Sequence, residues 1–158
     1  MLPVPIWDSL PEMAWKDKVC LLTYLSLQGP QVPTPLTHEF RPGEYVRLMR
    51  IPAGTLLTGR EHLQGHLMRL IEGSVTVVAP DGRFHFEAPS EMHTKPGFHA
   101  IVYAETDVLA ATVHPNPEES RDIDALEAAW FGTPESVVDR GKLIWEGLCL
   151  PQSQQPPH

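Results

Sequence analysis

Two histidines four residues apart, His62 and His66, are the side chains in this sequence best placed to share a metal ion. They stand in the segment REHLQGHLMRL, residues 60–70, with Gly65 between them. On a helix the two imidazoles would lie one turn apart and could bind one ion. On one straight strand they would face the same side but lie roughly 13 Å apart, too far for one ion. A bend at Gln64–Gly65 would bring them together, because glycine accepts backbone conformations that other residues avoid.

The surrounding residues favour the bent segment. The order Glu-His-x-x-x-His differs from the His-Glu-x-x-His of zinc proteases, and Gly65 is unfavourable inside a helix. The following residues, 75–78, are Val, Thr, Val and Val, a β-branched run that is typical of a strand. We therefore predict that the segment 60–71 bends and directs both histidines to one site.

Length, composition and charge limit the classes of protein to consider. The chain has 158 residues, which fits one domain able to remove about 70% of its unfolded surface from water. Its net charge of −8 argues against binding nucleic acid or an anionic membrane surface. No run approaches the ~20 apolar residues needed to span a bilayer. Cys20 and Cys149 lie far apart, and no secretory signal is visible, which predicts reduced thiols in a cytoplasmic protein.

The centre of the chain predicts β structure. Between residues 44 and 114, short runs of strand-forming residues alternate with turn residues, and EYVRLMRI (44–51) is one such run. The dipeptide Asp81-Gly82, flanked by strand formers, predicts a hairpin. Several strands at even spacing indicate an antiparallel sandwich or barrel.

Helical patterns flank this region. The segment 12–28 carries an apolar stripe at spacings of three and four and is followed by Gly-Pro. The segment 116–132 has an acidic start and a second stripe, and a short further helix is predicted in 134–148. The predicted architecture is mostly β, and it has three parts: an N-terminal extension with a helix (1–36), a β-barrel (37–115) and a C-terminal helical extension ending in a mobile tail (116–158).

Two stretches of the central region resemble the two motifs of the cupin superfamily. They are PAGTLLTGREHLQGHLMRLIEGSVTVV (52–78) and PSEMHTKPGFHAIVYAE (89–105). The first family motif runs from a glycine to a His-x-His pair, a glutamate and a second glycine. If that second glycine is Gly73, His66 falls at the glutamate position, His62 at the second histidine and Arg60 at the first. In the second stretch, KPGFH resembles the Pro-x-Gly…His of the family, with Pro96 and His99 each one residue closer to the glycine.

The region 37–131 is more closely similar to small cupin-like proteins of bacteriophage genomes. Shared features are Phe-x-x-Gly-x-Tyr-x-Arg, Ile-Pro-x-Gly and a His-Pro before an acidic helix. The resemblance implies a double-stranded β-helix, the cupin or jelly-roll barrel, which commonly pairs into a homo-oligomer, a dimer or higher. It implies the host cytoplasm or the virion as the location. It implies no particular activity, because the superfamily includes enzymes, sugar-binding modules and proteins with no known reaction.

The resemblance also implies a ligand set. His62, His66 and His99 are the predicted metal ligands, and His93 is the alternative third ligand. A one-residue slip of His99 on a strand would turn it to the opposite face and leave Ala100 at the ligand position. Arg60 and Glu61 lie where a substrate would approach, so they are weaker candidates for ligand contact. The other histidines are predicted to be surface or turn residues: His38, His85, His114 and His158.

Two functional interpretations follow. In the first, the histidine cluster holds one divalent metal (iron, manganese, nickel or zinc), whose open positions bind a small oxygen-bearing molecule for Lewis-acid chemistry or oxygen activation. In the second, the chain is a non-enzymatic, virion-type structural or interaction protein that uses a metal-free barrel as an oligomerising scaffold among virion proteins. Arg60 in place of a histidine and the flanking helices favour the second interpretation, and the His62–His66 pair favours the first.

Overall fold

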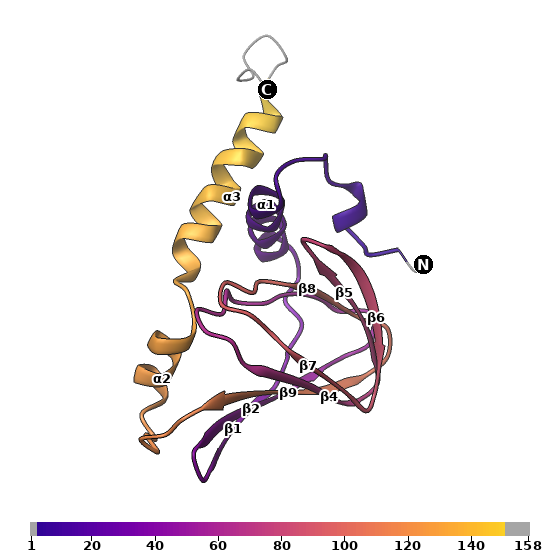
Figure 1. Ribbon diagram of the computed structural model, residues 1–158. Coiled ribbons are helices and arrows are strands. Elements are labelled where there is room, and N and C mark those ends of the chain that lie inside the picture. Colours follow the sequence, from indigo (N-terminus) through magenta and orange to yellow (C-terminus); the bar gives the residue numbers. More distant parts are fainter. Residues whose placement is uncertain (1–2, 151–158) are drawn as a thin grey trace. The chain divides into compact units, whose positions relative to one another are not determined.

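The computed structural model describes residues 3–150 and divides the chain into two compact units (Figure 1). The first unit consists of Pro3–Gln31 together with the chain from Thr133, and the second of Val32–Gly132. The tail predicted to be mobile, residues 151–158, lies outside the described residues. The candidate site lies wholly in the second unit.

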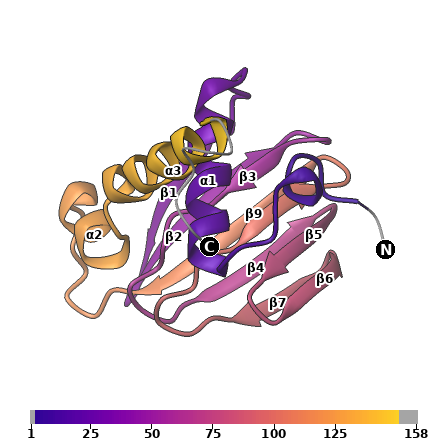
Figure 2. The ribbon, with the colours of Figure 1, turned by 90° about the horizontal axis from the view of Figure 1, so that it is seen from above.

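In the described part of the second unit, nine strands form two antiparallel sheets. Figure 2 shows the order β1-β2-β9-β4-β7 of the larger sheet, and the smaller sheet has the order β3-β8-β5-β6. The strands are β1 (Leu36–Arg41), β2 (Glu44–Ile51), β3 (Leu56–Thr58), β4 (Leu67–Glu72), β5 (Ser74–Ala79), β6 (Gly82–Glu87), β7 (Ser90–His93), β8 (Ile101–Ala104) and β9 (Val108–Pro115).

Turn residues and glycines in the sequence mark where the strands end. The run 44–51 is β2, as predicted. The predicted hairpin joins β5 and β6, although its two turn residues are Pro80 and Asp81, and Gly82 already pairs with Ala79. Gly73, between β4 and β5, has a φ of 90°, and a side chain there would meet the carbonyl oxygen of Asp107. Glycine at this position lets the chain pass from one sheet to the other.

The core of this unit follows the alternation of side chains along the strands. A cluster of buried apolar residues from both sheets includes Ile51, Leu70, Val75, Val77 and Val108. Successive side chains on a strand point to opposite faces, so residues two apart share the inner face. This alternation fixes which residues of β4 and β9 face the interior near the histidines.

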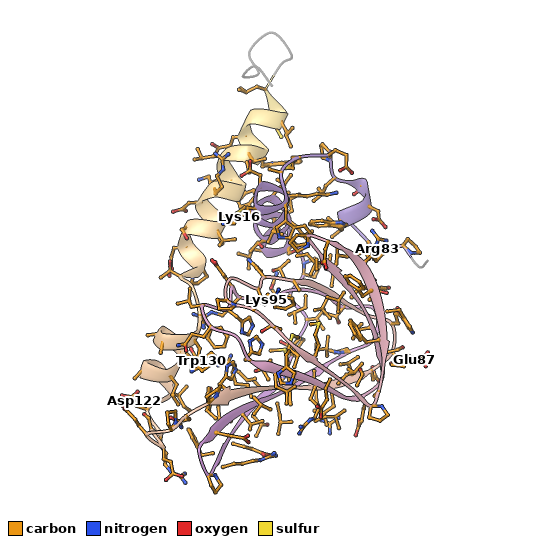
Figure 3. The ribbon with its side chains drawn as sticks, in the orientation of Figure 1. Lys16, Arg83, Glu87, Lys95, Asp122 and Trp130 are labelled. Carbon is orange, nitrogen blue, oxygen red and sulfur yellow. The ribbon has the colours of Figure 1, made fainter. Side chains whose placement is uncertain are left out.

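One helix, α2 (Ile123–Trp130), follows β9 in the second unit. It begins at Asp122, whose side chain accepts a hydrogen bond of 3.1 Å from the backbone N–H of Ala125, a stabilising N-cap. Leu126 and Trp130 are its buried residues, and Figure 3 labels Asp122 and Trp130 at its two ends. The predicted helical segment 116–132 is therefore confirmed for its second half.

The first unit contains the 3-10 helix η1 (Trp7–Ser9) and the helices α1 (Trp15–Gln28) and α3 (Pro134–Cys149). Gly141 of α3 lies against the Cys20 carbonyl of α1, where a side chain would overlap the backbone, and Arg140 pairs with Asp17 at 3.1 Å. The short helix predicted in 134–148 is thus a helix of 16 residues. Cys20 and Cys149 form no disulfide, and no helix within residues 3–150 has the length and apolar character to cross a membrane.

Candidate metal centre

Three imidazoles meet inside the second unit, those of His62, His66 and His114. One nitrogen from each lies within 4.8 Å of the others. Within residues 3–150 this is the group of three side chains close enough to bind one metal ion. The ring centroids of His62 and His66 are 3.9 Å apart, and those of His66 and His114 are 5.1 Å apart. His66 is 4% exposed and His114 is fully buried, so the cluster is largely shielded from water.

The predicted bend between His62 and His66 is confirmed. His62 precedes a bend at Leu63–Gln64, and the chain then enters β4 just after His66. The main chain of His62 is held on one side by Phe98 and Gly97, through N–H···O bonds of 2.8 and 2.7 Å. On its other side the main chain of His62 forms an antiparallel β-bridge with Phe131. The bent segment is therefore fixed by main-chain bonds from two separate parts of the chain.

Gly65 serves this bend in a different way from the one predicted. Its φ does not lie in the left-handed region. Instead, a side chain at this position would lie 2.7 Å from the carbonyl oxygen of Thr94. The backbone of Thr94 must come this close because its N–H donates to the carbonyl of His66 at 2.9 Å. Glycine is required by close approach of the two chain segments.

Replacing Gly65 by alanine is expected to lower the free energy of unfolding by about 1–3 kcal/mol, because the added methyl group displaces Thr94. The matched control is Gly59→Ala, whose methyl group would lie at an ordinary 3.7 Å from the nearest backbone oxygen. Urea denaturation of both variants measures the difference. Equal stability of the two variants would contradict the role assigned to Gly65.

His114 joins the cluster from the last strand. The β4–β9 register pairs Leu67 with Val113, and continuing it by one residue places His66 opposite His114 on the inner face. The prediction that His114 is a surface or turn residue is therefore wrong. Strand pairing carries β9 through Pro115, and the imidazole of His114 is fully buried.

The other predicted site residues lie outside the three-histidine cluster. His99 is half-buried but not part of the group, and Ala100 lines the interior cavity in its place, as the one-residue slip predicted. His93 is exposed at the end of β7. The Glu61 side chain contacts Gly132, and only its neighbour Arg60 lines the cavity.

Burial keeps the clustered histidines neutral. Desolvation lowers the pKa of His62 to about 3, with further lowering from its neighbours His66 and His114. The pKa of His114 is also lowered to about 3, and that of His66 is lowered, in both cases chiefly by desolvation. At neutral pH each ring therefore presents a lone pair, the form in which histidine binds metals.

Each ring also has a nitrogen without a hydrogen-bond partner. The Thr94 hydroxyl can donate to the carbonyl of His66 and accept from its Nδ1 at 2.8 Å, which leaves Nε2 bare. His114 Nε2 bonds with the Thr112 hydroxyl at 3.0 Å, which leaves Nδ1 bare, and Nδ1 of His62 is also buried and unpartnered. Two nitrogens bound to one ion at ~2.1 Å lie at most about 4.2 Å apart, so nitrogens that lie within 4.8 Å of one another need only a small movement of the rings to bind it. The residues present fit a metal ion.

Aromatic rings from the end of α2 enclose the cluster. The indole ring of Trp130 packs edge-on against His114, with centroids 4.5 Å apart. Phe131 packs edge-on against His62 at 4.9 Å and against His114 at 5.7 Å. Trp130 is 5% exposed and in contact with His114, so it attaches α2 to the barrel.

A cavity of about 290 Å³ between the two sheets adjoins His62. Its walls are mostly apolar and come from the inner faces of both sheets, with charged side chains of Arg47 and Arg60 near the histidine. Both arginines reach Glu127 of α2, at 2.8 Å from Arg47 and 3.4 Å from Arg60. The site therefore combines a nitrogen donor cluster, an apolar chamber and two cations.

Comparison with known proteins agrees with this architecture. No protein-family model matches the chain, and no curated protein sequence matches it. Among solved structures, a point mutant of salicylate 1,2-dioxygenase from Pseudoaminobacter salicylatoxidans in complex with gentisate is similar over 75% of this chain, with a TM-score of 0.50 and 16% identity. This chain spans 35% of the length of that enzyme. A cupin-2 domain containing protein from Shewanella frigidimarina is similar over 58% of this chain and 87% of its own, with a TM-score of 0.42 and 12% identity.

These likenesses concern the fold. The two antiparallel sheets and the likeness to the dioxygenase structure confirm the predicted mostly β fold, a jelly-roll barrel accompanied by helices.

Proposed function

We propose that this cupin barrel binds one divalent transition metal through His62, His66 and His114, and a small organic molecule in the adjoining cavity. The observation that carries the proposal is that the three clustered imidazoles each have a buried nitrogen without a hydrogen-bond partner. Buried polar atoms are rarely left unpaired unless a ligand, an ion or water completes them. Three neutral histidines suit iron, manganese, nickel or zinc.

The chain's own residues have defined tasks in this site. Thr94 and Thr112 hold the His66 and His114 rings through Nδ1 and Nε2 respectively, and so fix the tautomers that leave the other nitrogen of each ring available to a metal. Phe131 and Trp130 exclude water from one flank of the rings. A bound ion would supply Lewis-acid or redox chemistry to a molecule in the cavity.

Elemental analysis of the purified protein tests the proposal. We expect about one metal per chain in the wild type. Replacing His62, His66 or His114 by alanine should lower the metal affinity more than about 100-fold, because losing even a hydrogen-bond partner of a metal ligand typically lowers it 10–100-fold. His93→Ala is the matched control and should retain the metal. His99→Ala separates this ligand set from the one predicted from the sequence, because it should also retain the metal.

A wild-type protein that is folded but holds no metal would contradict the proposal and favour the second interpretation, an oligomerising scaffold of the virion type. Both interpretations predict a homo-oligomer. Light scattering on the same samples measures the oligomeric state, and the scaffold interpretation requires an oligomer that contains no metal. The similarity to phage cupin-like proteins also stays a prediction.

A further inference from the structure

The charges around the interior cavity are unequal. Arg69 and Glu91, which both line it, form an ion pair at 2.9 Å and neutralise each other. Arg47 and Arg60 also line it, and they share a single carboxylate, that of Glu127. Two guanidinium groups against one carboxylate leave one positive charge beside an otherwise apolar chamber.

Arg60 carries the uncompensated part of this charge. Arg47 makes the closer pair with Glu127, at 2.8 Å, and also donates to the Tyr45 hydroxyl at 3.2 Å. Arg60 makes only long bonds, each of 3.4 Å, to Glu127 and to the Gly132 carbonyl. Its Nε is buried and has no hydrogen-bond partner.

The guanidinium group of Arg60 is nevertheless held in place. It stacks on Phe131, with its central carbon 4.8 Å from the ring centroid, and Arg47 lies over the same ring at 4.7 Å. A guanidinium that is already oriented loses less side-chain entropy when it binds an anion. A planar carboxylate matches its donors better than a spherical ion does.

We propose that the cavity is the binding site of an apolar monocarboxylate whose carboxylate group is held by Arg60. The single excess charge of the lining side chains favours a monoanion, to which a bound metal ion would add attraction. The apolar walls, including Met49, Leu57, Val77, Val102 and Val108, specify a hydrocarbon body. The volume of about 290 Å³ suits a ligand on the order of ten non-hydrogen atoms. The inference rests on the proposed function in taking this cavity as the ligand chamber of the metal centre.

Titration calorimetry with three probes of similar size tests the inference: benzoate, benzyl alcohol and benzylamine. For the wild-type protein we expect benzoate to bind at least tenfold more tightly than the alcohol or the amine. Arg60→Met should weaken benzoate binding about 10–100-fold, the usual effect of losing a charged hydrogen bond, and should leave binding of the alcohol within about twofold. The matched control is the double substitution Arg69→Met with Glu91→Gln, which removes another cavity arginine together with its partner and leaves the net charge of the lining unchanged, and it should bind benzoate as the wild type does.

Each titration is done with the protein as purified and after treatment with a chelator, and the metal content of every sample is measured. Preference for benzoate that depends on Arg60, in a protein that already lacks metal as purified, would uphold this inference and overturn the proposed metal function. Full metal content with no preference for benzoate, or an equal effect of Arg60→Met and of the Arg69→Met, Glu91→Gln double substitution, would overturn the inference and leave the metal function standing.

Discussion

At pH 5 the metal-free protein is expected to be about 4 kcal/mol less stable to unfolding than at pH 8. The pKa values of His62 and His114 are lowered to about 3 by burial, whereas in the unfolded chain histidine titrates near 6.5. Between pH 6.5 and pH 3 the unfolded state therefore binds protons on these histidines that the folded state does not bind. Stability is fully present above pH 6.5 and is lost as pH falls, by about 2 kcal/mol per imidazole at pH 5.

Urea denaturation of chelator-treated protein at pH 8, 7, 6 and 5 measures this loss. His85 acts in the opposite direction, because Glu87 and Glu105 raise its pKa, but it is exposed and its effect is small. The matched comparison is His114→Gln, in which the acid-induced loss should be about half as large. A free energy of unfolding that stays constant from pH 8 to pH 5 would refute the burial of neutral imidazoles.

Replacing Trp130 by alanine is expected to lower the free energy of unfolding by about 3–5 kcal/mol, the cost of removing a large aromatic side chain from a well-packed core. Trp130 is 5% exposed and packs on the His114 ring at 4.5 Å. The substitution also opens a path for water to the histidine cluster, so the pKa of His114 should rise towards its usual value. Denaturation and a proton NMR titration of the imidazole signals measure the two effects.

Phe84→Ala is the matched control for Trp130→Ala. It also removes an aromatic ring from the second unit, but Phe84 is 40% exposed on β6, so its loss should cost less than about 1 kcal/mol. If the two substitutions cost the same, Trp130 does not anchor α2 on the histidine cluster.

The sequence predicted those features of the fold and site that depend on neighbouring residues. The strand 44–51 and the Asp81-Gly82 hairpin depend on local propensity and turn chemistry, and both are present. The bend between His62 and His66 followed from ruling out a helix and a straight strand within one short segment. The slip that places Ala100 on the inner face was visible from strand parity alone.

The features that depend on distant pairing were missed. His114 reaches the cluster because β9 pairs with β4 in a register that no local pattern encodes. One signal was available: Val108, Ala110, Thr112 and His114 alternate with a period of two, so an inward Val108 implies an inward His114. The reason for Gly65 was missed in the same way, because its neighbour Thr94 is 29 residues away along the chain.

The parts of the site are also made in a fixed order. A chain emerging from the ribosome folds from its N-terminal end, and all three imidazoles and every described strand are complete once Pro115 has appeared. The residues that close their open flank, Trp130 and Phe131, and the second main-chain bridge to His62 come only afterwards. If the barrel binds a metal ion as proposed, the ion would have an interval in which to enter before Trp130 and Phe131 cover the histidines.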